Sequence, residues 1–274
     1  MQAATTAEYC VAVGSQAMDA HTTGNYLVAV GHNALGANTT ASNNTALGDR
    51  TLYTNTTGSE NVAVGGLALY TNNASGNSAF GYSCMQYTTT GGANCGFGYQ
   101  TLTSNTTGQN NSAYGKSALQ TNTTGSDNVA IGRDSLLLNE SGNNNVAVGI
   151  YALNKNTASN STAVGIEALY NNTTGNNNVA VGNKALYAHT TGYENTAIGA
   201  RAGDSVTTGF RNCMMGEDAG DVITTGDNNV IIGRQSDASA SDASSQVVIG
   251  AALTGKGNST AFIGGSLGAY NGAT

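Results

Sequence analysis

The residues that could do chemistry in this chain are three histidines, four cysteines and sixteen acidic side chains. His21, His32 and His189 have no serine or carboxylate partner at a spacing that indicates a catalytic pair. The cysteines lack the spacing of a metal site or a disulfide framework, and the glycines lack the GxxxxGK pattern of a phosphate-binding loop. We therefore expect no enzymatic activity, no cofactor and no metal site.

The tyrosines are the remaining side chains that could contact a ligand. They recur at equivalent positions of a 17-residue sequence repeat, so one interpretation is that their rings stack between neighbouring repeats. The other interpretation is a face on which aromatic, Asn and Thr side chains contact a glycan. We favour stacking, and we take three residues as candidate receptor contacts: Tyr82, Tyr99 and Tyr151.

The repeat covers nearly the whole chain. Written as positions 1 to 17 it reads N-V-A-V-G-x-x-A-L-x-x-N-T-T-G-x-x, and residues 111–127 are a clear copy. The glycines at position 5 are 17 residues apart, except for two intervals of 16 residues and one of 14. Self-similarity at a fixed period predicts a solenoid. The sixteen glycines are Gly14, Gly31, Gly48, Gly65, Gly81, Gly98, Gly115, Gly132, Gly149, Gly165, Gly182, Gly199, Gly216, Gly233, Gly250 and Gly264.

Each repeat predicts one coil built from two short strands. Positions 1 to 4 alternate as a strand does, with β-branched residues at positions 2 and 4, and positions 8 to 11 fit a second strand. The position-5 glycine opens one turn. The Asn-Thr-Thr-Gly at positions 12 to 15 favours a type I turn, whose glycines, such as Gly125 and Gly175, we expect to have positive φ. The predicted fold is all-β: a parallel β-solenoid, or β-roll, of about sixteen 17-residue coils.

Four segments follow from the regularity of the repeat. Residues 1–9 form a lead-in, and residues 10–233 form the regular coils. Residues 234–246 are rich in Asp, Ala and Ser, so we expect an outward loop or a poorly ordered segment there, and residues 247–274 hold the shorter terminal coils.

Position 4 of the repeat predicts self-assembly. The small residues at positions 3 and 8 imply a thin coil, which leaves no room inside for the large apolar side chains at position 4. An exposed apolar stripe would aggregate in a monomer, so another copy of the chain must cover it. We expect a homotrimer in preference to a dimer. The trimer-core candidates are Val64, Phe80, Phe97, Tyr114, Ile131, Val148, Val164, Val181 and Ile198.

Composition excludes some partners. Only 9% of residues are charged, the formal net charge is −7, and Lys and Arg form no cluster, so we expect no nucleic-acid binding. No stretch reaches membrane-spanning length, and we expect no membrane insertion. The four cysteines (Cys10, Cys84, Cys95 and Cys213) replace small or apolar residues and are predicted to be buried thiols. His21 and His189 replace Asn at position 12, which favours a structural role.

Several phrases of the sequence resemble a known group of proteins. Residues 44–48 (Asn-Thr-Ala-Leu-Gly), 68–72, 122–132 and 195–199 resemble the repeat shafts of bacteriophage tail fibres, and residues 258–264 are similar to head repeats of trimeric autotransporter adhesins. The resemblance spans about residues 10–264. It implies a trimeric fibre located in the virion, with itself and other tail or fibre proteins as partners. A host-surface glycan as a further partner rests on the tyrosine, Asn and Thr side chains described above. The sequence shows no secretory leader, which favours the phage group.

Our functional hypothesis is a non-enzymatic structural protein: the trimeric shaft of a phage tail fibre, or of a related injection device, involved in host-surface attachment. The alternative is a bacterial cell-surface adhesin or extracellular matrix fibre. A third hypothesis is an ice-binding solenoid, because threonine pairs recur at positions 13 and 14. We rank it last, since these threonines are adjacent and lie in a predicted turn.

Overall fold

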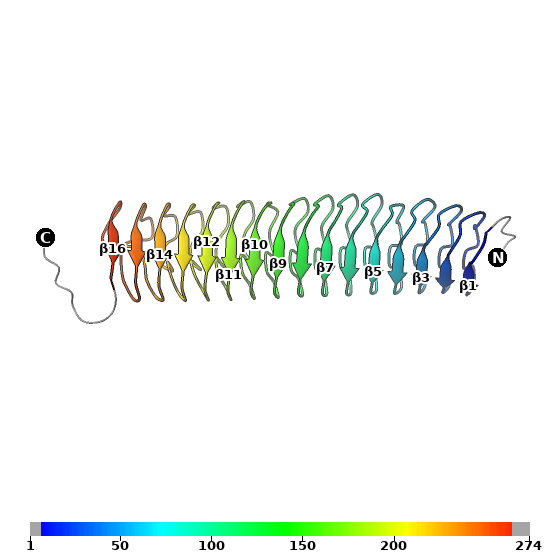
Figure 1. The fold of residues 1–274 in the computed structure, drawn as a ribbon, viewed down its shortest axis with the longest axis horizontal. Coiled ribbons are helices and arrows are strands. Elements are labelled where there is room, and N and C mark those ends of the chain that lie inside the picture. Colours follow the sequence, from blue (N-terminus) through cyan, green and yellow to red (C-terminus); the bar gives the residue numbers. More distant parts are fainter. Residues whose placement is uncertain (1–6, 265–274) are drawn as a thin grey trace. The chain divides into compact units, whose positions relative to one another are not determined.

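The computed structural model describes residues 7–264, which form sixteen three-residue strands and no helix. Parts of two expected segments, residues 1–6 of the lead-in and 265–274 of the terminal coils, lie outside the described residues. The chain divides into two compact units, Met1–Asn145 (unit 1) and Val146–Thr274 (unit 2). The predicted all-β parallel β-solenoid is confirmed: each coil contributes one strand, and within a unit the strands run in the same direction (Figure 1).

Unit 1 holds the first eight strands and unit 2 the other eight. Consecutive strands of a unit pair in parallel with equivalent repeat positions opposite one another, as in Ala12 opposite Ala29 and Ala163 opposite Ala180. The strands of unit 1 are β1 (Val11–Val13), β2 (Val28–Val30), β3 (Thr45–Leu47), β4 (Val62–Val64), β5 (Ser78–Phe80), β6 (Cys95–Phe97), β7 (Ser112–Tyr114) and β8 (Val129–Ile131). Those of unit 2 are β9 (Val146–Val148), β10 (Thr162–Val164), β11 (Val179–Val181), β12 (Thr196–Ile198), β13 (Cys213–Met215), β14 (Val230–Ile232), β15 (Val247–Ile249) and β16 (Ala261–Ile263).

The strands cover only positions 2 to 4, and position 3 points into the coil. From β2 onward the position-3 alanines, such as Ala63 and Ala147, are fully buried, whereas their neighbours at positions 2 and 4 are at least partly exposed. Successive side chains of a strand point to opposite faces, so a three-residue strand sends one side chain inward and two outward.

The predicted second strand at positions 8 to 11 is wrong. Residues at positions 7 and 9, such as Arg50 and Leu52, have φ of 51° and 50°, which lies outside the β region. This segment still bonds to the next coil, because Leu52 N donates to Ala68 O (3.1 Å) and Thr54 N donates to Tyr70 O (3.0 Å). The left-handed conformation turns the position-9 side chain into the core, where Leu52 is fully buried. Burying a leucine offsets a conformational cost of about 1–2 kcal/mol.

The glycines at position 5 and those at position 15 of the repeat are required for different reasons. At position 5, Gly31 has a φ of 138°, and a Cβ there would lie 2.3 Å from Gly48 O of the next coil. At position 15, Gly125 and Gly175 do not have positive φ, so that prediction is wrong. A Cβ on Gly125 would instead lie 2.4 Å from Asn122 Oδ1 and 2.5 Å from a carbonyl oxygen of the next coil. Close approach therefore selects glycine at position 15.

Two columns of buried asparagine side chains run through the coils, at positions 1 and 12. At position 1, Asn111 N and Nδ2 both donate to Asn94 Oδ1 (2.9 and 3.1 Å), and Nδ2 also donates to Gly125 O (2.9 Å). At position 12, Asn122 Nδ2 donates to Asn105 Oδ1 (2.8 Å) and to Gly125 O (2.9 Å). Each amide thus closes its own turn and bonds to the neighbouring coil, which satisfies polar groups that would otherwise be costly to bury.

Residues 234–246 do not form the expected outward loop. Thr224 N donates to Ser241 O (2.8 Å) and Ser245 N donates to Asp227 O (3.0 Å), so the segment continues the coil register. Ser236, Ala238 and Ala243 are buried. Small side chains that suit a flexible loop also fit the narrow interior of a coil, and here they fill it.

Large and small residues exchange places in the core. Near the end of the chain, Gly203 and Gly220 replace the usual position-9 leucine, and Met214 replaces the position-3 alanine of β13. A Cβ on Gly203 would lie 2.6 Å from Met214 Sδ, so the glycine makes room for the methionine. The reverse exchange occurs in unit 1, where Gly96 at position 3 accommodates Cys84 and Met85 of the preceding coil.

This exchange predicts that Gly96→Ala is destabilising although alanine is the usual residue at position 3. The new Cβ would lie 2.7 Å from Cys84 Sγ and 2.9 Å from Met85 Cε, and we expect a loss of about 1–3 kcal/mol in unfolding free energy. Chemical denaturation of both proteins measures the difference.

Two variants make this test specific. Adding Cys84→Ala and Met85→Leu to Gly96→Ala restores the usual residues and should recover most of the loss. Gly66→Ala is the matched control, because its Cβ would meet Tyr82 Cδ2 at an ordinary 3.4 Å. An unchanged stability for Gly96→Ala alone would contradict the proposed exchange.

Candidate functional site

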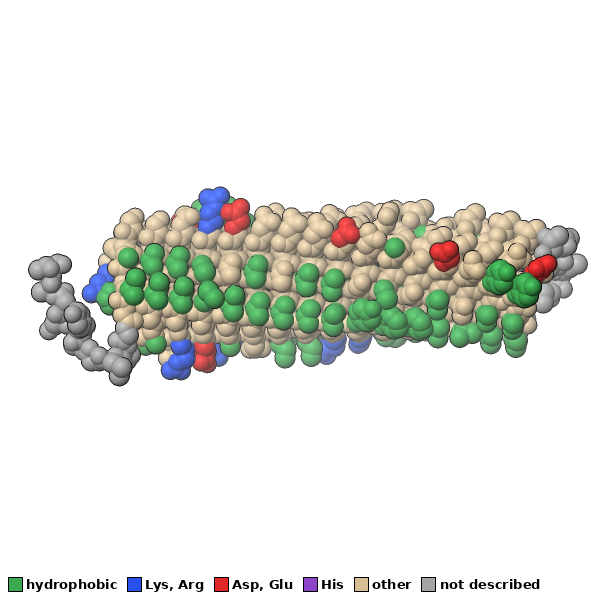
Figure 2. All heavy atoms as spheres, viewed as in Figure 1, with side chains coloured by type: hydrophobic (Ala, Val, Ile, Leu, Met, Phe, Trp, Pro, Cys, Tyr) green, Lys and Arg blue, Asp and Glu red, His purple; other side chains and the backbone are tan. Residues whose placement is uncertain are grey.

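The outward side of the strands forms an uncharged surface in each unit. We call it the strand face, and it consists of positions 2 and 4, the first and third residues of strands β1 to β16. None of these residues is Lys, Arg, Asp or Glu. Figure 2 shows rows of hydrophobic side chains along this face in both units. Most position-2 residues are Val, Thr, Ser or Cys, and position 4 is always a large apolar or aromatic residue.

All nine trimer-core candidates lie on the strand face. The structure therefore confirms that position 4 points out of the coil, while assembly through it stays a prediction. Ile131 is 42% exposed although it lies beside Tyr114 of the neighbouring strand β7. The more exposed candidates are Phe97, Tyr114, Ile131, Val164 and Ile198, and the half-buried ones are Val64, Phe80, Val148 and Val181.

The strand face of unit 1 carries an aromatic stack. The rings of Phe80 and Phe97 have centroids 4.4 Å apart, and those of Phe97 and Tyr114 are 5.2 Å apart, with interplanar angles of 6°. Cys95 Sγ lies 3.3 Å from Tyr114 Oη on the same face. The hydrogen bond to Cys95 raises the pKa of Tyr114. The stack fills part of the face with rigid, flat side chains.

Tyrosine stacking between coils is confirmed, and the candidate receptor contacts are divided between the two units. Tyr82 and Tyr99 of unit 1 stack with centroids 5.9 Å apart and are 51% and 48% exposed. Tyr151 belongs to unit 2 and meets Tyr170 edge-to-face at 6.1 Å. The remaining stacked pairs predicted from the sequence are Tyr53 with Tyr70 and Tyr170 with Tyr187.

Among residues 7–264, four ion pairs join a Lys or Arg side chain to a carboxylate on a neighbouring coil. Arg201 Nε donates to Asp218 Oδ1 (2.6 Å) and Arg211 Nε donates to Glu194 Oε2 (2.8 Å), at exposed positions where such pairs contribute little stability. His32 Nδ1 lies 2.9 Å from Asp49 Oδ1, and this hydrogen bond lowers the pKa of the Asp49 carboxyl. Within residues 7–264 no group of three or more His, Cys, Asp or Glu side chains could hold a metal ion.

His21 and His189 are structural, as predicted, because each takes an asparagine's place in the position-12 column. His189 is fully buried, with Nδ1 3.0 Å from Asn172 Oδ1 and Nε2 3.1 Å from Asn195 Nδ2. An amide nitrogen donates, so His189 Nε2 accepts and the imidazole is neutral, with its proton on Nδ1. Burial lowers the pKa of His189 to about 4. His21 is oriented differently: its Nδ1 lies 3.2 Å from Asn38 Nδ2 of the next coil, and because the amide nitrogen donates, Nδ1 accepts.

The cysteines are free thiols, and only one of the four is buried as predicted. Burial raises the pKa of Cys84 to about 12, so this thiol is inert. Cys10, Cys95 and Cys213 are half-buried, so the prediction is wrong for these three. Position 2, which Cys95 and Cys213 occupy, faces outward in a three-residue strand.

No protein-family model matches this chain, and no curated protein matches it either. Within residues 7–264 the structure has no helix that is both long and apolar enough to span a lipid bilayer.

The buried His189 predicts an acid-sensitive step in stability. Its pKa is about 4 in the folded chain and near 6.5 in the unfolded chain, so the unfolded chain binds more protons between these values. Stability should therefore fall by about 1–3 kcal/mol as the pH drops from 6.5 to 4. His189→Asn, which restores the usual residue, should remove this part of the pH dependence of the melting temperature.

Two controls separate this effect from other titrations. Asp237 acts in the opposite direction, because burial raises its pKa to about 6 and the folded chain then gains stability as the pH falls below 6. The comparison is therefore made between His189→Asn and the exposed His32→Asn at pH 7.5 and 4.5. An equal loss on acidification in both variants would show that His189 does not carry the step.

Proposed function

We propose that this protein is a structural fibre protein whose copies associate through the strand face, and that the assembly is a homotrimer. The observation that carries the proposal is the strand face itself: apolar at position 4, partly exposed and free of charged side chains throughout strands β1 to β16. Large exposed apolar patches on soluble proteins mark interaction surfaces. Because the face carries no charged side chains, two copies of it do not repel each other electrostatically, which suits a symmetric interface.

The size of the strand face supports a stable interface. With eight strands in each unit, the face extends over about 38 Å by about 10 Å, at ~4.8 Å between strands and ~3.3 Å per residue. Each unit therefore offers about 400 Å², and the two units together about 800 Å², the area that each partner buries in a standard protein interface.

A second copy of this chain fits the strand face better than an unrelated partner does. The position-4 side chains recur once per coil, but the intervals include two of 16 residues, and bulky aromatics cluster in β5 to β7. Another copy placed parallel and in register reproduces this pattern coil by coil. Three copies around one axis would cover each face with two others, so we prefer the trimer to the dimer.

We further propose that this trimer is the shaft of a phage tail fibre, or of a related injection device, that takes part in host-surface attachment. The support is the resemblance of residues 44–48, 122–132 and 195–199 to tail-fibre repeats, together with the solenoid fold. The alternative is a bacterial cell-surface adhesin or matrix fibre. Detection of the chain by mass spectrometry in purified virions would support the phage fibre, and detection only on bacterial cells would support the adhesin or matrix fibre.

Ice binding has less support than the phage-fibre and adhesin functions. At position 13, Thr106 Oγ1 donates to Thr123 O (2.9 Å) and Thr123 Oγ1 donates to Glu140 O (2.8 Å). The hydroxyl protons of this column are thus used between coils and do not point to an external lattice. Absence of thermal hysteresis in the purified protein would exclude this function.

Assembly through the strand face predicts that Ile131→Asp breaks the trimer. Three symmetry-related carboxylates would be buried together without partners, which is severely unfavourable. Val148→Asp makes the same test in unit 2. Light scattering coupled to gel filtration should give the mass of a monomer for both variants and of a trimer for the wild type.

Ile150→Asp is the matched control, because Ile150 is 38% exposed but lies at position 6, off the strand face. This variant should remain trimeric. A trimeric Ile131→Asp protein, or a monomeric wild type, would show that the strand face is not the interface.

The orientation of the copies can be read from the native thiols Cys95 and Cys213, which both lie on the strand face. A parallel, in-register trimer brings like cysteines of different copies to the same level. A short bis-maleimide should therefore link Cys95 to Cys95 and Cys213 to Cys213, as identified by peptide mass spectrometry. Links between Cys95 and Cys213 would indicate antiparallel packing instead.

A further inference from the structure

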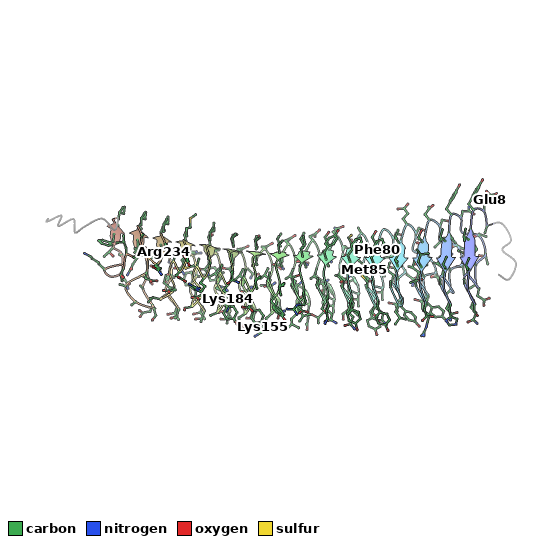
Figure 3. The ribbon with its side chains drawn as sticks, turned by 90° about the horizontal axis from the view of Figure 1, so that it is seen from below. Glu8, Phe80, Met85, Lys155, Lys184 and Arg234 are labelled. Carbon is green, nitrogen blue, oxygen red and sulfur yellow. The ribbon has the colours of Figure 1, made fainter. Side chains whose placement is uncertain are left out.

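A row of tyrosines and lysines occupies the side of unit 2 that faces away from the strands. Tyr170 and Tyr187 stack with centroids 5.5 Å apart and an interplanar angle of 17°, and Tyr151 meets Tyr170 edge-to-face. Lys155 Nζ lies 5.0 Å from the ring centroid of Tyr170, and Lys184 Nζ lies 5.4 Å from that of Tyr187. Both lysines lie on the side opposite the strands in Figure 3. We call these five residues the tyrosine–lysine strip.

The geometry of the strip decides what part of each ring a ligand could contact. Stacked rings cover one another's faces, so Tyr170 and Tyr187 cannot both offer a flat face to a sugar. They instead present their edges, and each phenol hydroxyl can donate and accept a hydrogen bond. A ligand along the strip would therefore meet repeated hydroxyl groups at the spacing of the coils, between two ammonium groups.

The charge of the strip indicates an anionic ligand. Lys155 is exposed, its Nζ donates to Asn171 Oδ1 (2.9 Å), and it takes part in none of the ion pairs found among residues 7–264. Lys184 has only a loose pair, with Nζ 3.6 Å from Glu167 Oε2. With Glu167 counted, the two ammonium groups give the strip a net positive charge, and the row ends at Asp204, which takes the repeat position of Tyr187 on the next coil.

We propose that the tyrosine–lysine strip is a binding site for an acidic polysaccharide, with Lys155 and Lys184 holding carboxylate groups and the tyrosine hydroxyls bonding to the sugar chain. This inference rests on the proposed function, since it assigns the class of host-surface ligand that the fibre would contact. The strip lies away from the strand face, so assembly leaves it exposed. Three copies in a trimer would present three strips to one polymer and raise the affinity by multivalency.

A second tyrosine pair in unit 1 serves as an internal control. Tyr53 and Tyr70 occupy the same repeat position as Tyr170 and Tyr187 and stack at 5.4 Å with an angle of 22°. No lysine lies over either ring among the described residues. The two pairs thus share their stacking and differ in the flanking cations, so a comparison of variants separates packing from binding.

The test measures binding of polygalacturonate, a linear polymer of carboxylated sugars, to the full chain by isothermal titration calorimetry at low salt. The wild type should bind polygalacturonate and not neutral dextran, and binding should weaken as salt is added. Lys155→Gln should weaken binding about tenfold by removing a charge-assisted hydrogen bond. The double variant Tyr170→Phe/Tyr187→Phe should weaken it too while leaving the melting temperature unchanged, because the rings still stack.

The matched controls are Lys116→Gln, which removes an exposed lysine of unit 1, and Tyr53→Phe/Tyr70→Phe. Both should bind polygalacturonate as the wild type does. Equal losses in Lys155→Gln and Lys116→Gln, equal binding of dextran, or no binding of polygalacturonate at low salt would each overturn the proposal. Light scattering on the same samples reports assembly separately, so an assembled trimer without binding refutes this inference alone.

Discussion

The constraint on which this structure depends is that every coil must repeat the hydrogen-bonding frame of the coil before it. Backbone groups bond along the stack at the strand and at the turns, as in Val62 N to Asn77 O (2.9 Å). The buried amide column at position 1 uses the same frame, because the amides of Asn94 and Asn111 bond to each other and to a glycine carbonyl. A coil out of register would leave these buried groups without partners, at a cost of about 1–3 kcal/mol each. The frame therefore fixes which side chains point in and which point out.

The repeated hydrogen-bonding frame also places the strand face and the tyrosine–lysine strip on different sides of each coil. Because position 3 is the only strand position that faces the core, positions 2 and 4 can vary in size without affecting the interior. The strand face and the tyrosine–lysine strip consequently lie on different sides of each coil. The strand face can therefore serve association between copies and the tyrosine–lysine strip can bind a ligand. A substitution on either surface leaves the buried amides undisturbed.

The sequence predicted the period, a strand within positions 1 to 4, the outward direction of position 4 and the stacking of tyrosines, because each follows from a pattern repeated many times. It did not predict the left-handed residues at positions 7 and 9. Leucine normally avoids positive φ, and nothing local marks Leu52 or Leu69 as exceptions. It also missed the amide columns, since Asn is an ordinary turn residue and its burial follows only from stacking. For the site, the aromatic residues were visible and Lys184 lies three residues before Tyr187, but Lys155 approaches the ring of Tyr170 from the preceding coil.

The exchange of large and small residues in the core has a consequence for how such a chain can change its length. The coil that contains Leu186 is followed by one that contains Gly203, and Gly203 in turn precedes the strand that contains Met214. If the coil with Gly203 were deleted, the side chains of Leu186 and Met214 would compete for the same volume. In the stretch from Gly98 to Gly132, where position 9 is leucine and position 3 is alanine, a whole coil could be lost or duplicated without such a conflict. Deletion or duplication of whole repeats should therefore be confined to the uniform part of the solenoid. The later coils, whose core residues fit one another, should keep their order.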